Sequence, residues 1–418
     1  MDSAKIAQKL RAQILRFSGE LSLGLPKVVS RLVREMLYGI QARQSVRLTE
    51  VSRALAEPIP IKKTVSRLSR QLAHPSLGTW LASRLLAMAA DRVRQTTLLI
   101  VDLSDIHKKY AEKMEHLAPV WDGSEKLKAW GYWTLNIIAA ETNSAQVVPL
   151  YGRLYSQKAP GFDSENTELR TAIRRVAEKT KKRGIWVMDR GGDRGYLYRY
   201  LLPERLNFII RARSDRTFLT DKRESALEAA GSCPMLFHEY IAKEEAGEEK
   251  PLRLEVGVRR VRLPGRPEEL SLVVVRGFGR EPLMLLTNLR LTRSRKSIWH
   301  VVAAYLTRWR IEETIRFMKQ SYQLEDVRLL KYTRLQNLMV LLTAVLYFTA
   351  VDLGIRLKLR VLSKHLVRAA RRVFGIPDFR LYSLADGIKH VLFGRSRGIG
   401  PWPRQPPPTF TQRLLFDA

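Results

Sequence analysis

The spacing of apolar residues changes several times along the chain, and each change marks a different kind of secondary structure. Residues 1–90 have apolar positions at helical spacing with basic residues between them, which predicts a helical N-terminal segment. Within it, residues 48–72 (LTEVSRALAEPIPIKKTVSRLSRQL) predict a short helix, a proline-containing turn and a second helix. On a helical wheel the second helix has a basic arc (Lys63, Arg67 and Arg70) opposite an apolar one (Ile61, Val65, Leu68 and Leu72). One docked face and one basic face are typical of a recognition helix that enters a DNA groove, although an ordinary amphipathic surface helix has the same pattern.

From residue 97 onward the pattern becomes that of strands. The segment TLLIVDL (97–103) is almost continuously apolar, as expected of a strand buried on both faces. Residues 132–152 contain two apolar runs around a Thr-Asn-Ser turn, and a helix should follow from about Glu165 to Lys182 with Ser164 as its N-cap. The runs GIWVMD and LNFIIRA predict two more strands, separated by a short helix in RGYLYRYL. Strands followed by alternating helices and strands predict an α/β core with a mixed sheet.

The remaining third of the chain has two further changes of pattern. Residues 213–290 hold apolar runs separated by turns such as PGRPEE, which predicts a β-rich insertion. Helix returns at about Ser297. The apolar stretch 338–351 is shorter than the ~20 residues that a membrane span needs, so a buried core helix is expected. The proline-rich residues 400–410 predict an extended tail.

These patterns divide the chain into five predicted segments. They are a helical DNA-binding domain, the first part of the α/β core, the β-rich insertion, the final helices of the core, and a C-terminal helical region with its tail (1–90, 91–212, 213–290, 291–355 and 356–418).

Charge narrows the class of partner. The 418 residues include 73 Lys and Arg against 41 Asp and Glu, a net charge of +32 spread along most of the chain. Such a field attracts polyanions, so a nucleic acid (double-stranded DNA or RNA) is the first expected partner and no membrane is expected, although a ribosome-associated or merely basic protein would carry the same charge. The single cysteine, Cys233, excludes an intramolecular disulfide, and the N-terminus lacks the apolar core of a signal peptide. No phosphate-binding GxxxxGK[ST] loop is present, so ATP hydrolysis is not supported.

Two aspartates share one structural context. Asp102 ends the apolar run LLIVD and Asp189 ends IWVMD, so both should lie at the rim of a sheet, where a carboxylate can reach a metal ion without being buried unpaired. An aspartate at the end of a strand often has only a turn-forming role, so neither is decisive alone.

A third acidic residue lies in a segment predicted to form one helix, YLTRWRIEETIRFMK (305–319). Four polar residues of this helix fall within an arc of about 60° (Tyr305, Arg308, Glu312 and Lys319). Ala304, Ile311, Ile315 and Met318 form the packed face beside it. Glu312 could then hold a cation while its neighbours bind phosphate oxygens, although a solvated helix face with Glu–Arg and Glu–Lys pairs has the same appearance.

The spacing Tyr-x₂-Arg-x₃-Glu-x₆-Lys resembles the YREK signature of DDE transposases of the insertion-sequence-four type, and all four positions match. The segments IVDLSDI (100–106) and VMDRGGDRG (187–195) are similar to that family's two aspartate motifs. The resemblance covers roughly residues 45–350 and includes the long gap before Glu312, which in this family holds a β-rich insertion.

This resemblance implies an RNase H-like core in which Asp102, Asp189 and Glu312 bind two Mg²⁺ ions, with Mn²⁺ as a possible substitute. Two metals would activate the attacking oxygen and stabilise the leaving one in phosphodiester transfer. The implied activity is cleavage of transposon ends and joining of the 3′-OH to target DNA, through a hairpin intermediate. Tyr305, Arg308 and Lys319 would grip the DNA backbone near a flipped base. A homodimer on DNA in the bacterial cytoplasm, associated with the nucleoid, is expected.

Several neighbouring side chains are weaker candidates. Asp105 and Asp193 do not directly end a buried strand, and Glu313 lies off the polar arc. His107 is more often a surface or phosphate-contacting residue than a metal ligand in such a position. Trp309 is expected to pack beside the site, and Trp299 is expected to pack under its helix rather than to stack on a base.

Two alternative functions remain open at this stage. An RNase H-like metal-dependent nuclease without joining activity would share the three carboxylates. A non-catalytic DNA-binding regulator would share the basic helix, although the presence of all the acidic and YREK residues speaks against it.

Overall fold

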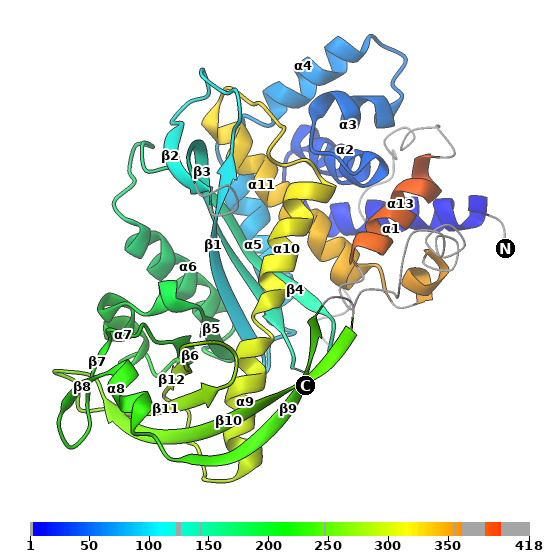
Figure 1. Cartoon of the computed structure of the whole chain (residues 1–418). Coiled ribbons are helices and arrows are strands. Elements are labelled where there is room, and N and C mark those ends of the chain that lie inside the picture. Colours follow the sequence, from blue (N-terminus) through cyan, green and yellow to red (C-terminus); the bar gives the residue numbers. More distant parts are fainter. Residues whose placement is uncertain are drawn as a thin grey trace, which may run out of the picture. The chain divides into compact units, whose positions relative to one another are not determined.

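The computed structural model describes residues 3–122, 127–142, 144–245, 248–354, 356–361 and 381–393 (Figure 1). The chain forms two compact units, each built from separate stretches of sequence. Unit 1 comprises Met1–Leu85, Ile106–Gly131 and Phe317–Ala418, and unit 2 comprises Leu86–Asp105 and Tyr132–Arg316. The five sequential segments stay a prediction, and the proline-rich residues 400–410 lie outside the described residues.

Unit 1 is mostly helical, as its sequence pattern predicts. The basic helix and its partner are confirmed as two helices with a short connection between them, α3 (Leu48–Leu55) and α4 (Ile61–Gln71). The other elements are α1 (Ser3–Leu21), α2 (Lys27–Arg43), the larger part of α5 (Leu77–Ala90), the short strand β2 (Ala118–Asp122), α11 (Tyr332–Tyr347), the π-helical turn η2 (Phe348–Asp352) and α13 (Leu381–Phe393).

The apolar helix near the end of unit 1 is longer than its sequence indicated. Residues Tyr332–Asp352 form one 21-residue helical stretch that is long and apolar enough to cross a membrane by length and composition. The helix extends beyond the apolar stretch 338–351 because α11 begins in polar residues and η2 continues to Asp352. Since 83% of its apolar window is buried inside the protein, it is the core helix that the sequence predicts.

Unit 2 is organised around a mixed β-sheet. Its path runs β3-β1-β5-β6-β12-β11-β10-β7-β8, with β4 beside β3 and β9 beside β10. Strands β1, β5 and β6 are parallel neighbours, whereas β3 pairs antiparallel with β4. These strands are β1 (Leu98–His107), β3 (Leu127–Ala140), β4 (Val147–Tyr155), β5 (Ile185–Met188) and β6 (Asn207–Arg211). The antiparallel pair β3–β4 beside the parallel strands β1, β5 and β6 confirms the predicted α/β core with a mixed sheet.

The predicted β-rich insertion is also confirmed, and it continues the same sheet instead of forming a separate one. Strand β12 pairs antiparallel with β6, and β9 to β12 form successive antiparallel pairs (Figure 1). The strands are β7 (Thr217–Leu219), β8 (Arg223–Ser225), β9 (Met235–Glu245), β10 (Glu248–Arg262), β11 (Glu269–Arg276) and β12 (Leu283–Thr287), with the short helix α8 (Ala226–Gly231) between β8 and β9.

Serine caps begin three helices of unit 2 where the sequence offers a hydroxyl. Ser164 accepts a hydrogen bond from the Thr167 amide and starts α6 (Glu165–Lys179), as predicted, although α6 ends three residues earlier than expected. Ser225 forms a capping box at α8, and Ser294 caps α9 (Arg295–Leu306). The remaining helical elements are η1 (Arg190–Gly192), α7 (Gly195–Leu201) and α10 (Trp309–Ser321).

The single helix expected over residues 305–319 is wrong. Helix α9 ends at Leu306, and α10 begins at Trp309. The hydroxyl of Thr307 donates to the carbonyl of Ala303 at 2.8 Å, which offers the backbone a local alternative at the break. Tyr305 therefore closes one helix, Arg308 lies in the connection, and Glu312 lies in the first turn of the next helix.

Candidate active site

The register of the parallel strands places two acidic residues side by side. Ile100 pairs with Val187 across β1 and β5, so Asp102 and Asp189 are level with each other two residues further on. Met188 pairs with Ile210 across β5 and β6, which puts Arg211 next to Asp189 in the same row. Asp102 and Asp189 thus lie beside each other, as their shared sequence context predicts. The expectation that both end a strand is correct only for Asp189, because β1 continues through Asp102 to His107.

The turn after β5 fixes the direction of Asp189. Its Oδ1 accepts a hydrogen bond from the Gly191 amide at 2.8 Å and caps η1. A Cβ atom on Gly192 would meet the Cβ of Met188 at 2.6 Å, so this turn requires glycine at position 192. Arg194 also holds this turn, because it donates a hydrogen bond to the carbonyl of Gly191 at 2.6 Å and forms an ion pair with Glu165 of α6.

Three neighbouring acidic or imidazole side chains do not lie beside Asp102 and Asp189 as further candidate ligands. Asp105 and His107 lie at odd positions of β1, on the opposite face from Asp102. Asp193 is fully buried, and its two carboxylate oxygens accept hydrogen bonds from Tyr198 Oη, Arg216 Nε and the Arg213 amide, each at 2.8 Å. Asp193 is thereby committed to holding the fold, which favours Asp189 as the reactive carboxylate.

Helices α9 and α10 and their connection contribute three more polar side chains near Asp102 and Asp189. Arg308 donates from Nη2 to Glu312 Oε1, and its guanidinium carbon lies 5.7 Å from the centre of the Tyr305 ring. The Arg308 side chain is largely buried, and its Nε has no hydrogen-bond partner among the described residues. Glu312 is half exposed, with 48% of its side chain accessible. The packed face predicted for this segment is confirmed, since Ala304, Ile311, Ile315 and Met318 are all buried.

Electrostatic coupling shows that these side chains share one site. Burial raises the pKa of Asp102 to about 7, and the charges of Asp189 and Glu312 add to this rise while Arg308 opposes it. Burial alone would lower the pKa of Arg308, but Tyr305 and then Glu312 and Asp102 raise it, so the guanidinium stays charged. Residues from three distant parts of the chain therefore meet as one acidic cluster with an arginine beside it.

The donor set of this cluster suits a hard divalent cation. Carboxylate oxygens are the ligands that Mg²⁺ prefers. Burial is the main cause of the raised pKa of Asp102, and the charges of Asp189 and Glu312 add to it, so a cation beside these carboxylates would offset both effects. In the present conformation no group of three His, Cys, Asp or Glu side chains among the described residues is close enough to hold one ion. Glu312 would have to leave Arg308 to complete the set, and its position at the exposed edge of α10 permits that rotation.

A cavity of about 400 Å³ in unit 2 adds residues that the sequence did not single out. It is lined by Tyr305, by the ring of Phe278 and by three arginines (Arg190, Arg211 and Arg280). Arg211 ends the central parallel strand β6 and is level with Asp189, which follows β5, and that position was the signal that could have found it. Phe278 and Arg280 come from the β11–β12 turn, which no local pattern connects with Tyr305.

The structure places Lys319 and Trp309 of α10 away from the positions expected from the sequence. Lys319 lies two turns after Glu312 on α10 but belongs to unit 1, where it pairs with Glu325 at 3.3 Å. Trp309 is 46% exposed, so the expectation that it packs beside the site is wrong. Trp299 is half-buried on α9.

The basic helix α4 of unit 1 agrees with its predicted DNA-binding face only in part. Lys63 and Arg70 are exposed, and Leu68 and Leu72 are fully buried. Arg67 instead pairs with Glu35 at 2.6 Å and with Glu57 at 2.8 Å, so its assignment as a DNA contact is corrected to a structural one. Ile61 is 48% exposed, contrary to the expectation that it docks, because it occupies the first turn of α4.

Comparison with known proteins agrees with this site in part. Residues 144–348, just under half of the chain, match the family described as "Transposase DDE domain". This confirms the predicted similarity to DDE transposases for a segment that contains Asp189 and Glu312 but begins after Asp102. No curated protein matches the chain.

Among solved structures, a piggyBac transposase synaptic complex with hairpin DNA aligns with a TM-score of 0.42 and 11% identity, over 94% of this chain and 81% of that one.

Proposed function

We propose that the chain is a DDE transposase that cleaves the ends of a DNA element and joins the freed 3′-OH to target DNA. The observation that carries this proposal is the level placement of Asp102 on β1 and Asp189 after β5 in unit 2. The charge of Glu312 on α10 also acts on Asp102. The match of residues 144–348 to a transposase DDE domain supports it independently. The finer assignment, to the insertion-sequence-four type with its YREK signature, rests on the resemblance in sequence.

In this mechanism the three carboxylates would hold two Mg²⁺ ions, whose chemistry is to activate an attacking oxygen and stabilise a leaving one. Hydrolysis comes first: the oxygen of a water molecule forms a bond to phosphorus, the P–O3′ bond breaks, and the departing oxygen takes a proton to become a 3′-OH. In the joining step this hydroxyl loses its proton and attacks a target phosphate, and another 3′-oxygen leaves. No covalent bond between protein and DNA is needed.

The remaining polar residues would bind and orient the DNA backbone. The buried Nε of Arg308 is a donor with no partner among the described residues, so a phosphate oxygen is a fitting acceptor. Tyr305 shares a cavity with Arg190 and Arg211, and Lys319 extends the basic side of α10. Lys63 and Arg70 on α4 would make phosphate or groove contacts at a separate place. The hairpin intermediate, the homodimer on DNA and the bacterial cytoplasm belong to the proposal through the same resemblance.

The proposal is tested with duplexes that carry the inverted repeats flanking this gene. In Mg²⁺, the wild-type protein should nick at the repeat ends and join a pre-cut 3′-OH end to a plasmid target. Asp102→Ala, Asp189→Ala and Glu312→Ala should reduce both reactions to background while DNA binding persists. Glu313→Ala is the matched control, because Glu313 is the next carboxylate on α10 and pairs with Arg316 instead.

Each outcome has a distinct meaning. Cleavage without joining by the wild-type protein would identify a nuclease and overturn the proposal. Unchanged cleavage in the three carboxylate variants would remove the site assignment.

A further inference from the structure

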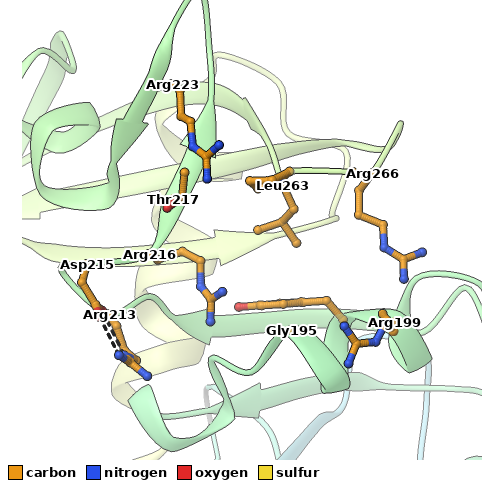
Figure 2. Close-up of a pocket in the computed structure, with 12 residues that line it drawn as sticks. Gly195, Arg199, Arg213, Asp215, Arg216, Thr217, Arg223, Leu263 and Arg266 are labelled. Atoms are coloured by element: carbon orange, nitrogen blue, oxygen red, sulfur yellow. Dashed lines mark hydrogen bonds and ion pairs between the residues drawn. The ribbon is translucent and has the colours of Figure 1, made fainter.

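A second cavity in unit 2, of about 490 Å³, has five arginines among its twelve lining residues (Figure 2). The five arginines come from four places. Arg199 lies on α7, Arg213 and Arg216 follow β6, Arg223 lies on β8, and Arg266 lies in the turn between β10 and β11. This arginine pocket shares no lining residue with the cavity at Tyr305. No local sequence pattern marks it, because its walls meet only in the folded sheet.

The arginine pocket has a large excess of positive charge. Asp215 is the one acidic residue in its lining, and it is paired with Arg213 (Figure 2). Among the described residues, the structure gives no carboxylate partner to three of the arginines (Arg199, Arg223 and Arg266). Like charges gathered in a concave surface focus the field and raise the local concentration of anions. Guanidinium groups in particular match the geometry of phosphate oxygens.

The same turn that fixes the catalytic carboxylate also supports this pocket. Asp189 starts the turn and Asp193 ends it. The buried Asp193 carboxylate holds Arg216 Nε at 2.8 Å and Tyr198 Oη at 2.8 Å, while Arg216 also donates to the Asp193 carbonyl at 2.6 Å. A pocket wall held by a buried ion pair is preorganised, which reduces the cost of ordering it when a ligand binds.

We propose that the arginine pocket is a phosphate-binding site that takes backbone phosphates of a DNA strand outside the carboxylate cluster. The inference rests on the proposed function for its ligand, since a transposase must hold DNA on both sides of the bond it cuts. Small-molecule sites are lined mainly by apolar and aromatic groups, whereas only Tyr198, Leu263 and Pro264 supply such surface here. The exposed positions of Arg199 and Arg223 leave the pocket open to a long strand.

The test measures DNA binding without cleavage, using the full-length protein in EDTA and a fluorescent duplex of arbitrary sequence. The pocket variant is Arg199→Ala/Arg266→Ala. The matched control is Arg290→Ala/Arg293→Ala, which removes two exposed arginines of the same unit that line neither cavity. Each phosphate contact contributes about 0.9 to the slope of log K against log salt. Losing two contacts should therefore lower the slope by about 1.8 and weaken binding about 60-fold at 0.1 M salt, with the curves converging near 1 M.

A charge-conserving variant and a small-anion probe separate the remaining explanations. Arg199→Lys/Arg266→Lys should keep most of the slope, because each lysine still neutralises a phosphate. Calorimetry with inorganic pyrophosphate asks whether a small free anion is the ligand instead. Pyrophosphate binding that the alanine variant loses, together with an unchanged DNA slope, would overturn the inference in favour of a small-anion site. An equal slope change in the control would also overturn it.

Failure of this inference is distinguishable from failure of the proposed function. Binding in EDTA does not depend on Asp102, Asp189 or Glu312. A wild-type salt slope in the pocket variant would refute the assignment of the arginine pocket alone. Cleavage that survives loss of the carboxylates would refute the catalytic assignment alone.

Discussion

Replacing Asp193 by asparagine removes a charge from the most enclosed acidic group near the site. Its carboxylate accepts three hydrogen bonds at 2.8 Å, from Tyr198, Arg216 and the Arg213 amide. Asparagine offers one acceptor oxygen and turns an NH₂ group toward one of these donors. Removing one partner of a buried ion pair costs about 3–5 kcal/mol. Because the Arg216 side chain is 22% exposed, water recovers part of the loss, and we expect about 3 kcal/mol.

Urea unfolding of four proteins measures this effect: the wild type, Asp193→Asn, Arg216→Met and the double variant. The two residues should be coupled by about 2 kcal/mol, since they share one network. Asp215→Asn is the matched control on the same loop. Its pair with Arg213 is exposed on both sides (55% and 68%), so its loss should leave the urea midpoint close to that of the wild type. If Asp193→Asn proves no more harmful than this control, the reasoning from burial is refuted.

Two further predictions concern unit 1. Burial lowers the pKa of Lys108 to about 7, although Glu325 and Asp326 oppose the shift. The folded protein then binds fewer protons than the unfolded chain between pH 7 and 10.5, so its stability should rise with pH in that window by up to about 1.4 kcal/mol per unit. Lys108→Met should lack this rise in urea titrations. An identical pH profile in both proteins would instead mean that the three carbonyls bound by its ammonium keep it charged. On α4, Lys63→Ala/Arg70→Ala should lower the salt slope of DNA binding by about 1.8 and leave the melting temperature unchanged. Arg67→Ala should instead destabilise the fold by about 3 kcal/mol. If Arg67→Ala lowered the salt slope and left the melting temperature unchanged, Arg67 would be a DNA contact after all.

Local patterns predicted most of the elements because their causes are local. Continuous apolar runs mark β1 and β5 since both are buried on two faces, and the hydroxyl of Ser164 was sufficient to place the start of α6. The level positions of Asp102 and Asp189 also followed from sequence, because each follows an apolar run and the two runs form neighbouring parallel strands in register, although β1 continues past Asp102 to His107.

The features that sequence reasoning missed depend on contacts between distant residues. Nothing in the composition around Thr307 marks a helix break, since neither proline nor glycine occurs there. The wheel of α4 presents Arg67 as a free cation, whereas Glu35 and Glu57 reach it from other elements. The pairing of β12 with β6 merges the insertion with the core sheet, and no pattern within either strand specifies its partner.

The central claim is that Asp102, Asp189 and Glu312 together bind divalent ions, and Mn²⁺ binding followed by electron paramagnetic resonance tests it most directly. Adding wild-type protein to Mn²⁺ should lower the resonance signal of the free ion. The variants Asp102→Asn, Asp189→Asn and Glu312→Gln should each lose most of that Mn²⁺ binding. Asp105→Asn and Glu313→Gln, which change carboxylates of β1 and α10 outside the cluster, should bind as the wild type does. Equal Mn²⁺ binding in all six proteins would contradict the account.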